Sequence, residues 1–194
     1  REVEADLLMD RPQQFNQESS IGAVFLDRDG VLNRVIVRGG KPYPPSHLSE
    51  FEILPGTKEA LIKLNLERFL LIVVTNQPDV ARGKQKREKV EEMHTFLKRN
   101  LPLNDIFVCW HGLDGECECR KPMPGLLFQA SKKWQIDLKK SLIIGDRWRD
   151  IDSGYAAGCK TIFIDYKYDE ELNIQPDYIA TSIQDATQWV IENH

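Results

Sequence analysis

The chain has 194 residues, of which 41% are hydrophobic and 29% are charged, and its formal net charge is -4. This composition is that of a folded domain with one substantial core, and it excludes a disordered chain. The mild acidity counts against a dedicated nucleic-acid binder, and no apolar run approaches the roughly 20 residues that a membrane-spanning helix needs. No signal peptide opens the chain, so we expect a cytoplasmic protein. The first residue is Arg rather than Met, which is compatible with a start inside a longer protein.

Residues 1–20 are polar and mixed, and they are interpreted as an N-terminal extension with a candidate helix over residues 5–10. Residues 21–194 are predicted to form one domain, because short apolar runs alternate there with amphipathic segments. The apolar runs predict strands at 21–27, 69–77, 105–111, 141–146, 160–165 and 178–180, and the amphipathic segments predict helices at 55–68, 86–100, 124–136, 150–158 and 182–193. Continuously apolar strands that alternate with helices indicate an α/β fold, a Rossmann-like parallel sheet with helices on both faces.

Carboxylates follow two of the predicted strands, at the places where the sites of parallel α/β sheets form. Asp27 and Asp29 lie at the end of the first strand, in FLDRDG. Asp146 ends the run IIGD, and Asp150 follows one helical turn later. Carboxylates that converge in a partly buried place repel each other unless a cation compensates their charge. Mg²⁺ prefers carboxylate oxygens and is usually shared with a phosphate, so we expect a magnesium site at this edge of the sheet.

A phosphate group at such a site would allow a definite reaction. A carboxylate beside Mg²⁺ can attack phosphorus and form an aspartyl-phosphate, and a second carboxylate two residues on can protonate the leaving oxygen and then activate water. Thr75, at the end of the second strand, offers a hydroxyl and an N–H to the phosphoryl oxygens, and Lys121 offers a positive charge. The alternatives are a solvated turn at DRDG and a simple helix cap at GDRWRD.

Four short motifs, DRDGVLN, VVTNQ, RKPMPG and GDRWRD, occur in this order and resemble those of the haloacid dehalogenase superfamily of phosphohydrolases. The resemblance covers residues 21–166. It implies that Asp27 is the nucleophile and Asp29 the general acid/base. It also implies that Thr75 and Lys121 hold the phosphoryl group. The Mg²⁺ ligands that it implies are Asp27, Asp29 through its main-chain carbonyl, and Asp146, with Asp150 placed as an outer-shell partner.

Three of the four cysteines lie close together, in C109-W-H111-GLDGE-C117-E-C119, whereas Cys159 lies apart in an apolar context. Three thiols and one imidazole, Cys109, His111, Cys117 and Cys119, are a ligand set that suits a closed structural zinc site. We therefore predict a zinc loop over residues 109–119, and a reduced, metal-free loop is the alternative. A zinc loop before RKPMPG resembles the branch of the superfamily that contains heptose 1,7-bisphosphate phosphatases and histidinol-phosphate phosphatases. The resemblance implies that the loop aims Arg120 and Lys121 at the substrate.

The stretch between Asp27 and Thr75 is too short for a helical cap domain beside the predicted helix 55–68, so we expect a capless enzyme whose site is covered by loops. A sugar bisphosphate carries a second phosphate and demands extra basic groups, whereas histidinol phosphate carries a cation and demands acidic ones. The candidate substrate-binding residues are Asn76, Arg120, Arg147, Arg82 and Arg38, and further basic candidates are Lys41, Lys84 and Arg149.

These basic groups favour heptose 1,7-bisphosphate as the substrate, with Mg²⁺ and Zn²⁺ as cofactors and a small phosphorylated sugar as the partner of a monomeric chain. Two departures weaken this choice. Pro78 replaces a residue with a hydroxyl and an N–H in the family pattern, and the short gap between His111 and Cys117 is more similar to the histidinol-phosphate branch. Histidinol-phosphate phosphatase is the alternative within the class. A polynucleotide 3′-phosphatase and a non-catalytic module of a fusion protein are the more distant ones.

Overall fold

The computed structural model describes residues 21–112, 114 and 116–194, so the expected N-terminal extension and its candidate helix lie outside the described residues. Six parallel strands form the central sheet, in the spatial order β5 (Asp105–Cys109), β4 (Leu70–Asn76), β1 (Ala23–Leu26), β6 (Leu142–Gly145), β7 (Lys160–Ile164) and β8 (Tyr178–Ala180). Counted along the chain, this is the Rossmann order 3-2-1-4-5-6. The order reverses beside β1, and ligands of such sheets bind beyond the carboxyl ends of the strands at this point.

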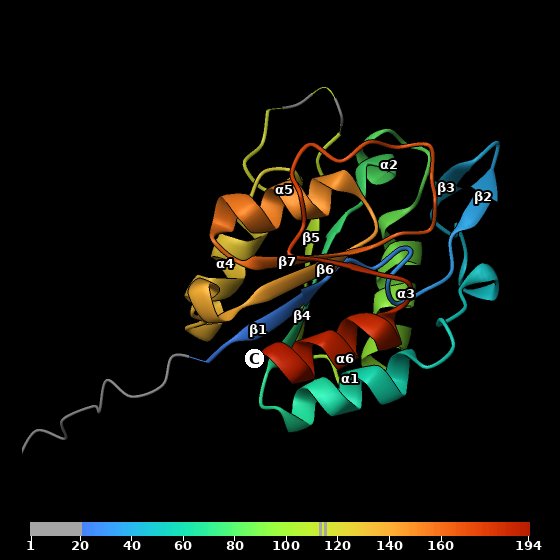
Figure 1. The fold of residues 1–194 in the computed structure, drawn as a ribbon. Helices are drawn as coiled ribbons and strands as arrows, with labels where there is room; N and C mark the ends of the chain where they lie inside the picture. Colours follow the sequence, from blue (N-terminus) through green and yellow to red (C-terminus); the bar gives the residue numbers. More distant parts are fainter. Residues whose placement is uncertain (1–20, 113, 115) are drawn as a thin grey trace, which may run out of the picture.

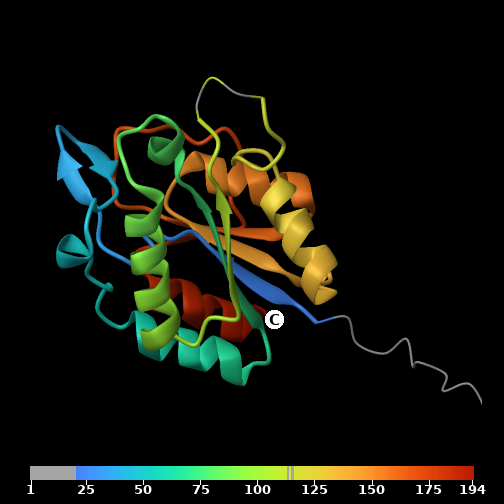
Figure 2. The same cartoon turned by 180° about the vertical axis from the view of Figure 1, so that it is seen from behind.

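Helices cover both faces of the sheet, as the sequence predicts (Figures 1 and 2). On one face lie α1 (Thr57–Leu66), α3 (Arg87–Asn100) and α6 (Ile183–Asn193), and on the other lie α4 (Gly125–Trp134) and α5 (Trp148–Ala157). Within β1, Val24 and Leu26 pack toward the first group of helices, and Ala23 and Phe25 pack toward the second. All four side chains are fully buried, which is why these strands read as continuous apolar runs.

The structure adds elements that the sequence analysis did not predict. The largest is a hairpin of β2 (Ile36–Arg38) and β3 (Lys41–Tyr43), which forms a separate two-stranded sheet at one side of the molecule. Its turn consists of Gly39 and Gly40, which both have positive φ, so a two-residue glycine turn was a readable signal. The others are the short helix α2 (Pro78–Ala81) and the 3₁₀ turns η1 (Leu48–Glu50) and η2 (Leu138–Lys140).

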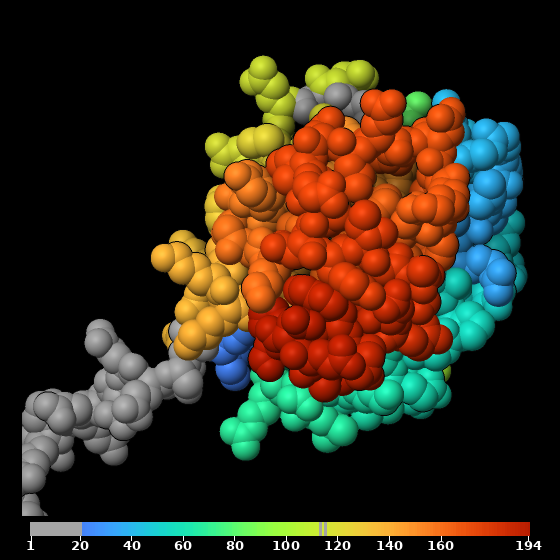
Figure 3. Space-filling model, viewed as in Figure 1, coloured from blue at the N-terminus to red at the C-terminus, as the bar shows by residue number. Residues whose placement is uncertain are grey.

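Between β1 and β4 the chain contains only the hairpin, η1 and α1, so no helical cap domain is inserted there, as the sequence predicts. In the space-filling view the segment after β7, residues 165–177, extends over the face of the molecule beside the hairpin (Figure 3). None of the helices among the described residues is both long and apolar enough to cross a membrane.

Candidate active site and metal-ligand cluster

The carboxyl ends of three neighbouring strands, β4, β1 and β6, bring the motif residues together. A cavity of about 370 Å³ opens at this edge of the sheet. Its lining includes every residue of the predicted catalytic and magnesium set: Asp27, Asp29, Thr75, Lys121, Asp146 and Asp150. Oxygens of Asp27, Asp146 and Asp150 lie within 4.8 Å of one another, close enough for one metal ion to contact them.

Asp27 is held between attraction and repulsion. Its carboxylate lies 3.0 Å from the ammonium of Lys121. Burial, and next the charge of Asp150, nevertheless raise the pKa of Asp27 to about 6, although Lys121 acts to lower it. The positive charge of Lys121 therefore does not fully offset the burial of Asp27 and the negative charges near it.

Asp146 is the least compensated group of the site. Its side chain is buried, and neither of its oxygens has a hydrogen-bond partner within the described part of the chain. Burial, and next the charges of Asp27 and Asp150, raise the pKa of Asp146 well above its ordinary value. A buried carboxylate without partners is costly, so the donor set fits a hard cation that would bind these oxygens.

Gly30 lets the first motif approach Asp146 this closely. Its φ is +89°, and a Cβ at this position would lie 2.0 Å from an oxygen of Asp146. Any larger residue would have to displace the carboxylate. The glycine of DRDG is therefore required by its neighbour across the site, and not by a simple solvated turn.

Lys121 and Asp150 form a buried pair in the lining of the cavity. The ammonium of Lys121 lies 2.5 Å from an oxygen of Asp150 and donates to the carbonyl of Val74 at 2.8 Å. The other oxygen of Asp150 accepts from the backbone N–H of Arg147 at 3.1 Å and caps α5. Burial alone would lower the pKa of Lys121, but the charges of Asp150 and Asp27 raise it. Asp150 therefore both orients Lys121 and begins the helix.

Asp29 is fixed by three neighbours. Arg28 donates to both of its oxygens, and Asn33 and Gln77 donate to it at 3.0 and 3.1 Å. Burial acts to raise the pKa of Asp29, but the charge and hydrogen bonds of Arg28, with those of Asn33 and Gln77, lower it below its ordinary value. Gln77 also donates to the hydroxyl of Thr75 at 3.0 Å. In the resting site Asp29 is ionised and ready to accept a proton.

The predicted substrate-binding residues divide into two groups. Asn76, Arg120 and Arg147 line the cavity, whereas Arg38 and Arg82 are absent from its lining within the described residues. Asn76 fixes the backbone of Lys121 through two hydrogen bonds of 3.0 Å, so the structure gives it a supporting role. Arg147 forms an ion pair with Glu170, which compensates its charge.

The two remaining arginines are engaged at the surface. Arg38 lies over the ring of Tyr43, and Arg82 pairs with Asp79 at 3.2 Å. Neither observation supports contact with a substrate in the cavity, so these two assignments stay unsupported predictions. Arg149 does line the cavity, next to the ring of Trp148.

Sequence reasoning missed several residues of the site. Tyr43 and Trp148 form aromatic walls of the cavity, and Arg28 and Gln77 hold Asp29. Tyr43 belongs to the hairpin that was not predicted. Trp148, Arg28 and Gln77 lie within the quoted motifs, where their position was readable but the direction of their side chains was not.

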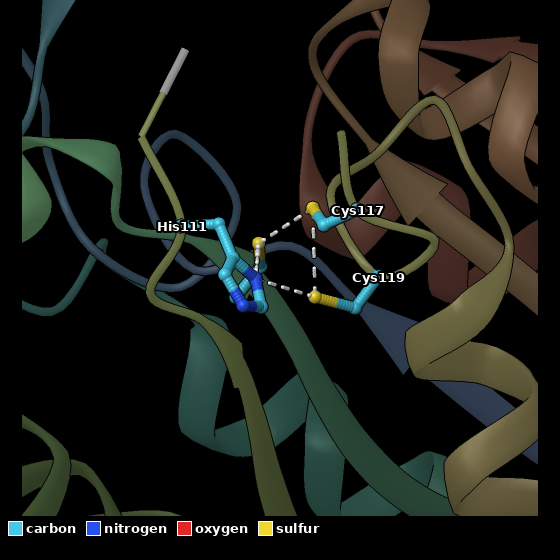
Figure 4. A group of neighbouring side chains, drawn as sticks. His111, Cys117 and Cys119 are labelled. Atoms are coloured by element: carbon cyan, nitrogen blue, oxygen red, sulfur yellow. Dashed lines mark hydrogen bonds between the residues drawn. The ribbon is translucent and has the colours of Figure 1, made fainter. Parts of the chain in front are cut away.

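The predicted zinc ligands converge on one another, as Figure 4 shows for His111, Cys117 and Cys119. Cys117 Sγ lies 3.7 Å from Cys109 Sγ and 3.8 Å from Cys119 Sγ, and His111 Nδ1 lies 3.5 and 3.2 Å from Cys109 Sγ and Cys119 Sγ. Two sulfurs bound to one tetrahedral Zn²⁺ at about 2.3 Å lie about 3.8 Å apart. The four side chains therefore fit a tetrahedral metal ion.

This cluster is linked to the cavity through Arg120. The backbone N–H of Arg120 donates to Cys117 Sγ at 3.3 Å, and its guanidinium donates to the carbonyl of Gly112. Arg120 is followed directly by Lys121, so the loop that the cluster fixes also carries a cavity residue and the buried ammonium.

A parallel sheet of Rossmann order with converging carboxylates and a buried lysine at its switch point defines a class of phosphoryl-transfer proteins. The comparisons with known proteins agree. The model of the HAD-hydrolase-like family matches residues 118–186. D-glycero-beta-D-manno-heptose-1,7-bisphosphate 7-phosphatase of Pasteurella multocida (strain Pm70) is 33% identical over 182 residues, which cover 87% of this chain and 96% of the relative.

A second relative, D-glycero-alpha-D-manno-heptose-1,7-bisphosphate 7-phosphatase of Photorhabdus laumondii, is 33% identical over 163 residues, 76% of this chain and 84% of the relative. The fold is similar to that of D,D-heptose 1,7-bisphosphate phosphatase from B. bronchiseptica complexed with magnesium and phosphate, with a TM-score of 0.78. The two sequences are 24% identical, and the match covers 90% of this chain and 100% of the other. The chain belongs to the haloacid dehalogenase superfamily and is a phosphatase. The family and fold class predicted from the motifs are thereby confirmed.

Proposed function

We propose that this phosphatase removes the 7-phosphate of D-glycero-D-manno-heptose 1,7-bisphosphate, with Mg²⁺ in the active site and through an aspartyl-phosphate intermediate. The observation that carries the proposal is the buried Asp146, whose raised pKa and lack of a hydrogen-bond partner show that its charge is not fully compensated, beside Asp27. Phosphatases of this substrate are relatives over most of the chain, and one similar structure is a complex with magnesium and phosphate.

In the proposed reaction Asp27 attacks phosphorus, and Lys121 and Thr75 hold the phosphoryl oxygens. Asp27, Asp146 and the carbonyl of Asp29 would hold Mg²⁺, which when bound neutralises charge on the phosphate and the carboxylates. Asp29 is ionised before the substrate binds. The negative phosphate then raises its pKa by repulsion, which favours a protonated Asp29 that can give its proton to the leaving oxygen. The same carboxylate then activates the water that hydrolyses the intermediate.

The wall of the cavity suits a sugar with a second phosphate. Tyr43 and Trp148 offer aromatic surface, and Arg120 and Arg149 offer positive charge. Arg149 has no carboxylate partner among the described residues, whereas Arg147 is paired with Glu170. Arg149 is therefore the better candidate than Arg147 for the second phosphate.

Cys109, His111, Cys117 and Cys119 form, in this proposal, a structural zinc site that keeps the loop 109–119 in place. Residues 21–194 are one phosphatase domain. The small phosphorylated sugar is its partner, without nucleic acid.

The test is phosphate release with Mg²⁺ from both anomers of heptose 1,7-bisphosphate, histidinol phosphate and a 3′-phosphorylated oligonucleotide, measured side by side. We expect kcat/KM for one anomer of heptose 1,7-bisphosphate to exceed kcat/KM for each of the other substrates by at least about tenfold. A preference for histidinol phosphate would show that the short metal loop was the better guide to the substrate. Turnover of none, by protein that contains both metals, would contradict the proposed substrate.

A further inference from the structure

Arg28 is a completely buried arginine in the middle of the first motif, between the two catalytic aspartates. Its Nε lies 3.1 Å from one oxygen of Asp29, and its Nη2 lies 2.9 Å from both. Its guanidinium also lies over the ring of Phe51, 5.7 Å from the centroid. A two-pronged contact of this kind fixes the plane of a carboxylate as well as its position. Buried cations without good partners are rare, so this geometry has to be supported on the remaining side.

His94 provides that support from helix α3. Its Nε2 lies 3.2 Å from Nη1 of Arg28, the prong that Asp29 does not occupy. The imidazole is 8% exposed, and burial, followed by the charge of Arg28, lowers the pKa of His94 to about 3. The guanidinium of Arg28 can only donate, so the neutral His94 ring accepts at Nε2 and carries its proton on Nδ1.

Trp110 is the aromatic neighbour of His94. The two ring centroids lie 6.3 Å apart, and the Trp110 ring is in turn covered by the guanidinium of Arg87 at 4.5 Å. Trp110 stands between the metal-ligand candidates Cys109 and His111. A continuous set of contacts therefore runs from the metal loop through Trp110, His94 and Arg28 to the carboxylate of Asp29.

From these contacts we propose that Arg28 and His94 are positioning residues, which hold the carboxylate of Asp29 in the orientation that proton transfer to the leaving oxygen requires. The proposal rests on the proposed role of Asp29 and goes beyond it, because it assigns a task to a histidine on a different element. Neither residue lines the cavity, so neither touches the substrate.

The experiment compares His94→Leu, which removes the acceptor, with His94→Gln, whose side-chain oxygen can replace Nε2. Each is assayed on the alkyl phosphate that the wild-type protein hydrolyses best and on p-nitrophenyl phosphate. The quantity is kcat/KM, which reports the step in which the leaving oxygen departs. Nitrophenolate leaves without a proton, so only the alkyl ester depends on Asp29 as an acid. General acids contribute about 10²–10⁴-fold to such steps.

We expect His94→Leu to lower kcat/KM for the alkyl phosphate by about tenfold or more, and for p-nitrophenyl phosphate by less than about threefold. His94→Gln should restore most of the loss. Leu97→Val, a buried apolar change on the same helix, serves as the control for packing and should affect both substrates alike. Equal losses on both substrates in His94→Leu, or a His94→Gln variant as impaired as His94→Leu, would overturn the proposal.

A crystal structure of His94→Leu tests the geometric step without any turnover. The expected result is a displaced or rotated guanidinium of Arg28 and a carboxylate of Asp29 that has lost its two-pronged contact. If both groups keep their wild-type positions, His94 does not position Asp29 even if activity changes. A wild-type protein inactive on every phosphate ester would instead contradict the proposed function, and this structure would still decide the role of His94.

Discussion

The side chains at the cavity differ in how completely their charges are compensated. Asp29 has Arg28, Asn33 and Gln77 as hydrogen-bond partners, whereas Asp146 has no hydrogen-bond partner within the described chain. Asp27 lies between these extremes, with Lys121 on one side and other carboxylates around it. In the sequence Asp27 and Asp29 are a simple pair within DRD, and Asp146 is a distant third carboxylate. Their different surroundings in the structure indicate a distinct task for each of them.

Asp27→Asn tests the nucleophile. The amide keeps the shape of the side chain but cannot form an acyl phosphate by attack on phosphorus. We expect kcat for phosphate release to fall by at least about a thousandfold, with the far-UV circular dichroism spectrum unchanged. Measured release within about tenfold of the wild-type rate would exclude the aspartyl-phosphate mechanism. Asp152→Asn, outside the cavity on α5, is the matched control.

At the scale of elements, two short segments do more than connect strands. The first turn of α5 depends on Asp150, which caps the helix and pairs with Lys121. The end of β5 and the loop after it place four metal-ligand candidates beside Arg120. In both cases the element is built around groups that also serve the site, so stability and activity should change together.

Asp150→Asn should therefore lower both the stability of the protein and its phosphatase activity. Breaking one partner of a buried ion pair costs about 3 kcal/mol or more, and Lys121 keeps only Asp27 as its carboxylate partner. We expect urea unfolding to show a loss of about 3 kcal/mol in the free energy of unfolding, with a lower kcat. For Asp152→Asn the change should stay within about 0.5 kcal/mol. Equal losses of stability in Asp150→Asn and Asp152→Asn would show that the ion pair of Asp150 with Lys121 does not stabilise the protein.

Cys117→Ser tests the metal cluster. Elemental analysis of the wild-type protein should find about one zinc per chain, and the serine variant should lose it and unfold at a lower temperature. Dependence of the remaining activity on Mg²⁺ should persist, because the two clusters have different ligands. Cys159→Ser, outside the cluster, should retain its zinc. A wild-type protein without zinc would contradict the zinc assignment.

At the scale of the whole molecule, the carboxylate cluster makes stability depend on pH and metal together. The pKa of Asp27 is raised to about 6, and that of Asp146 is also raised, whereas an unfolded chain titrates near 3.9. The folded metal-free protein thus binds more protons than the unfolded chain between about pH 4 and 6. Proton binding by these two groups therefore stabilises the folded, metal-free protein below about pH 4. This stabilisation is lost as the pH rises through about 6.

Mg²⁺ competes with these protons for the same oxygens. Addition of Mg²⁺ to chelator-treated protein should therefore raise Tm more at about pH 7.5 than at about pH 5. Differential scanning calorimetry at several Mg²⁺ concentrations measures both shifts. A Mg²⁺-induced shift that is equal at the two pH values would show that the ion does not bind the raised carboxylates. Asp146→Asn should abolish most of the shift.

The fold could be predicted almost completely from local patterns. Every expected strand and helix from residue 21 onward exists, because continuously apolar runs such as 70–74 can only be buried between two layers of helices. The five strands before β8 end a residue or two earlier than expected, since polar residues such as Asp27 and Asp146 leave the ladder to face the site. The hairpin with Tyr43 was missed, because its alternation is too short to distinguish a strand from a loop.

The sequence by itself determined the class of reaction, since the types and order of residues at the strand ends suffice to indicate phosphoryl transfer, and its Cys/His spacing predicts a metal cluster. Only the tertiary structure decided which charged side chains have partners and which residues those partners are. Glu170 is 23 positions from Arg147 and His94 is 66 from Arg28, and no local pattern links residues at such separations. Periodicity acts over a few residues along the chain, whereas charge compensation and burial act through space, where packing brings distant segments into contact.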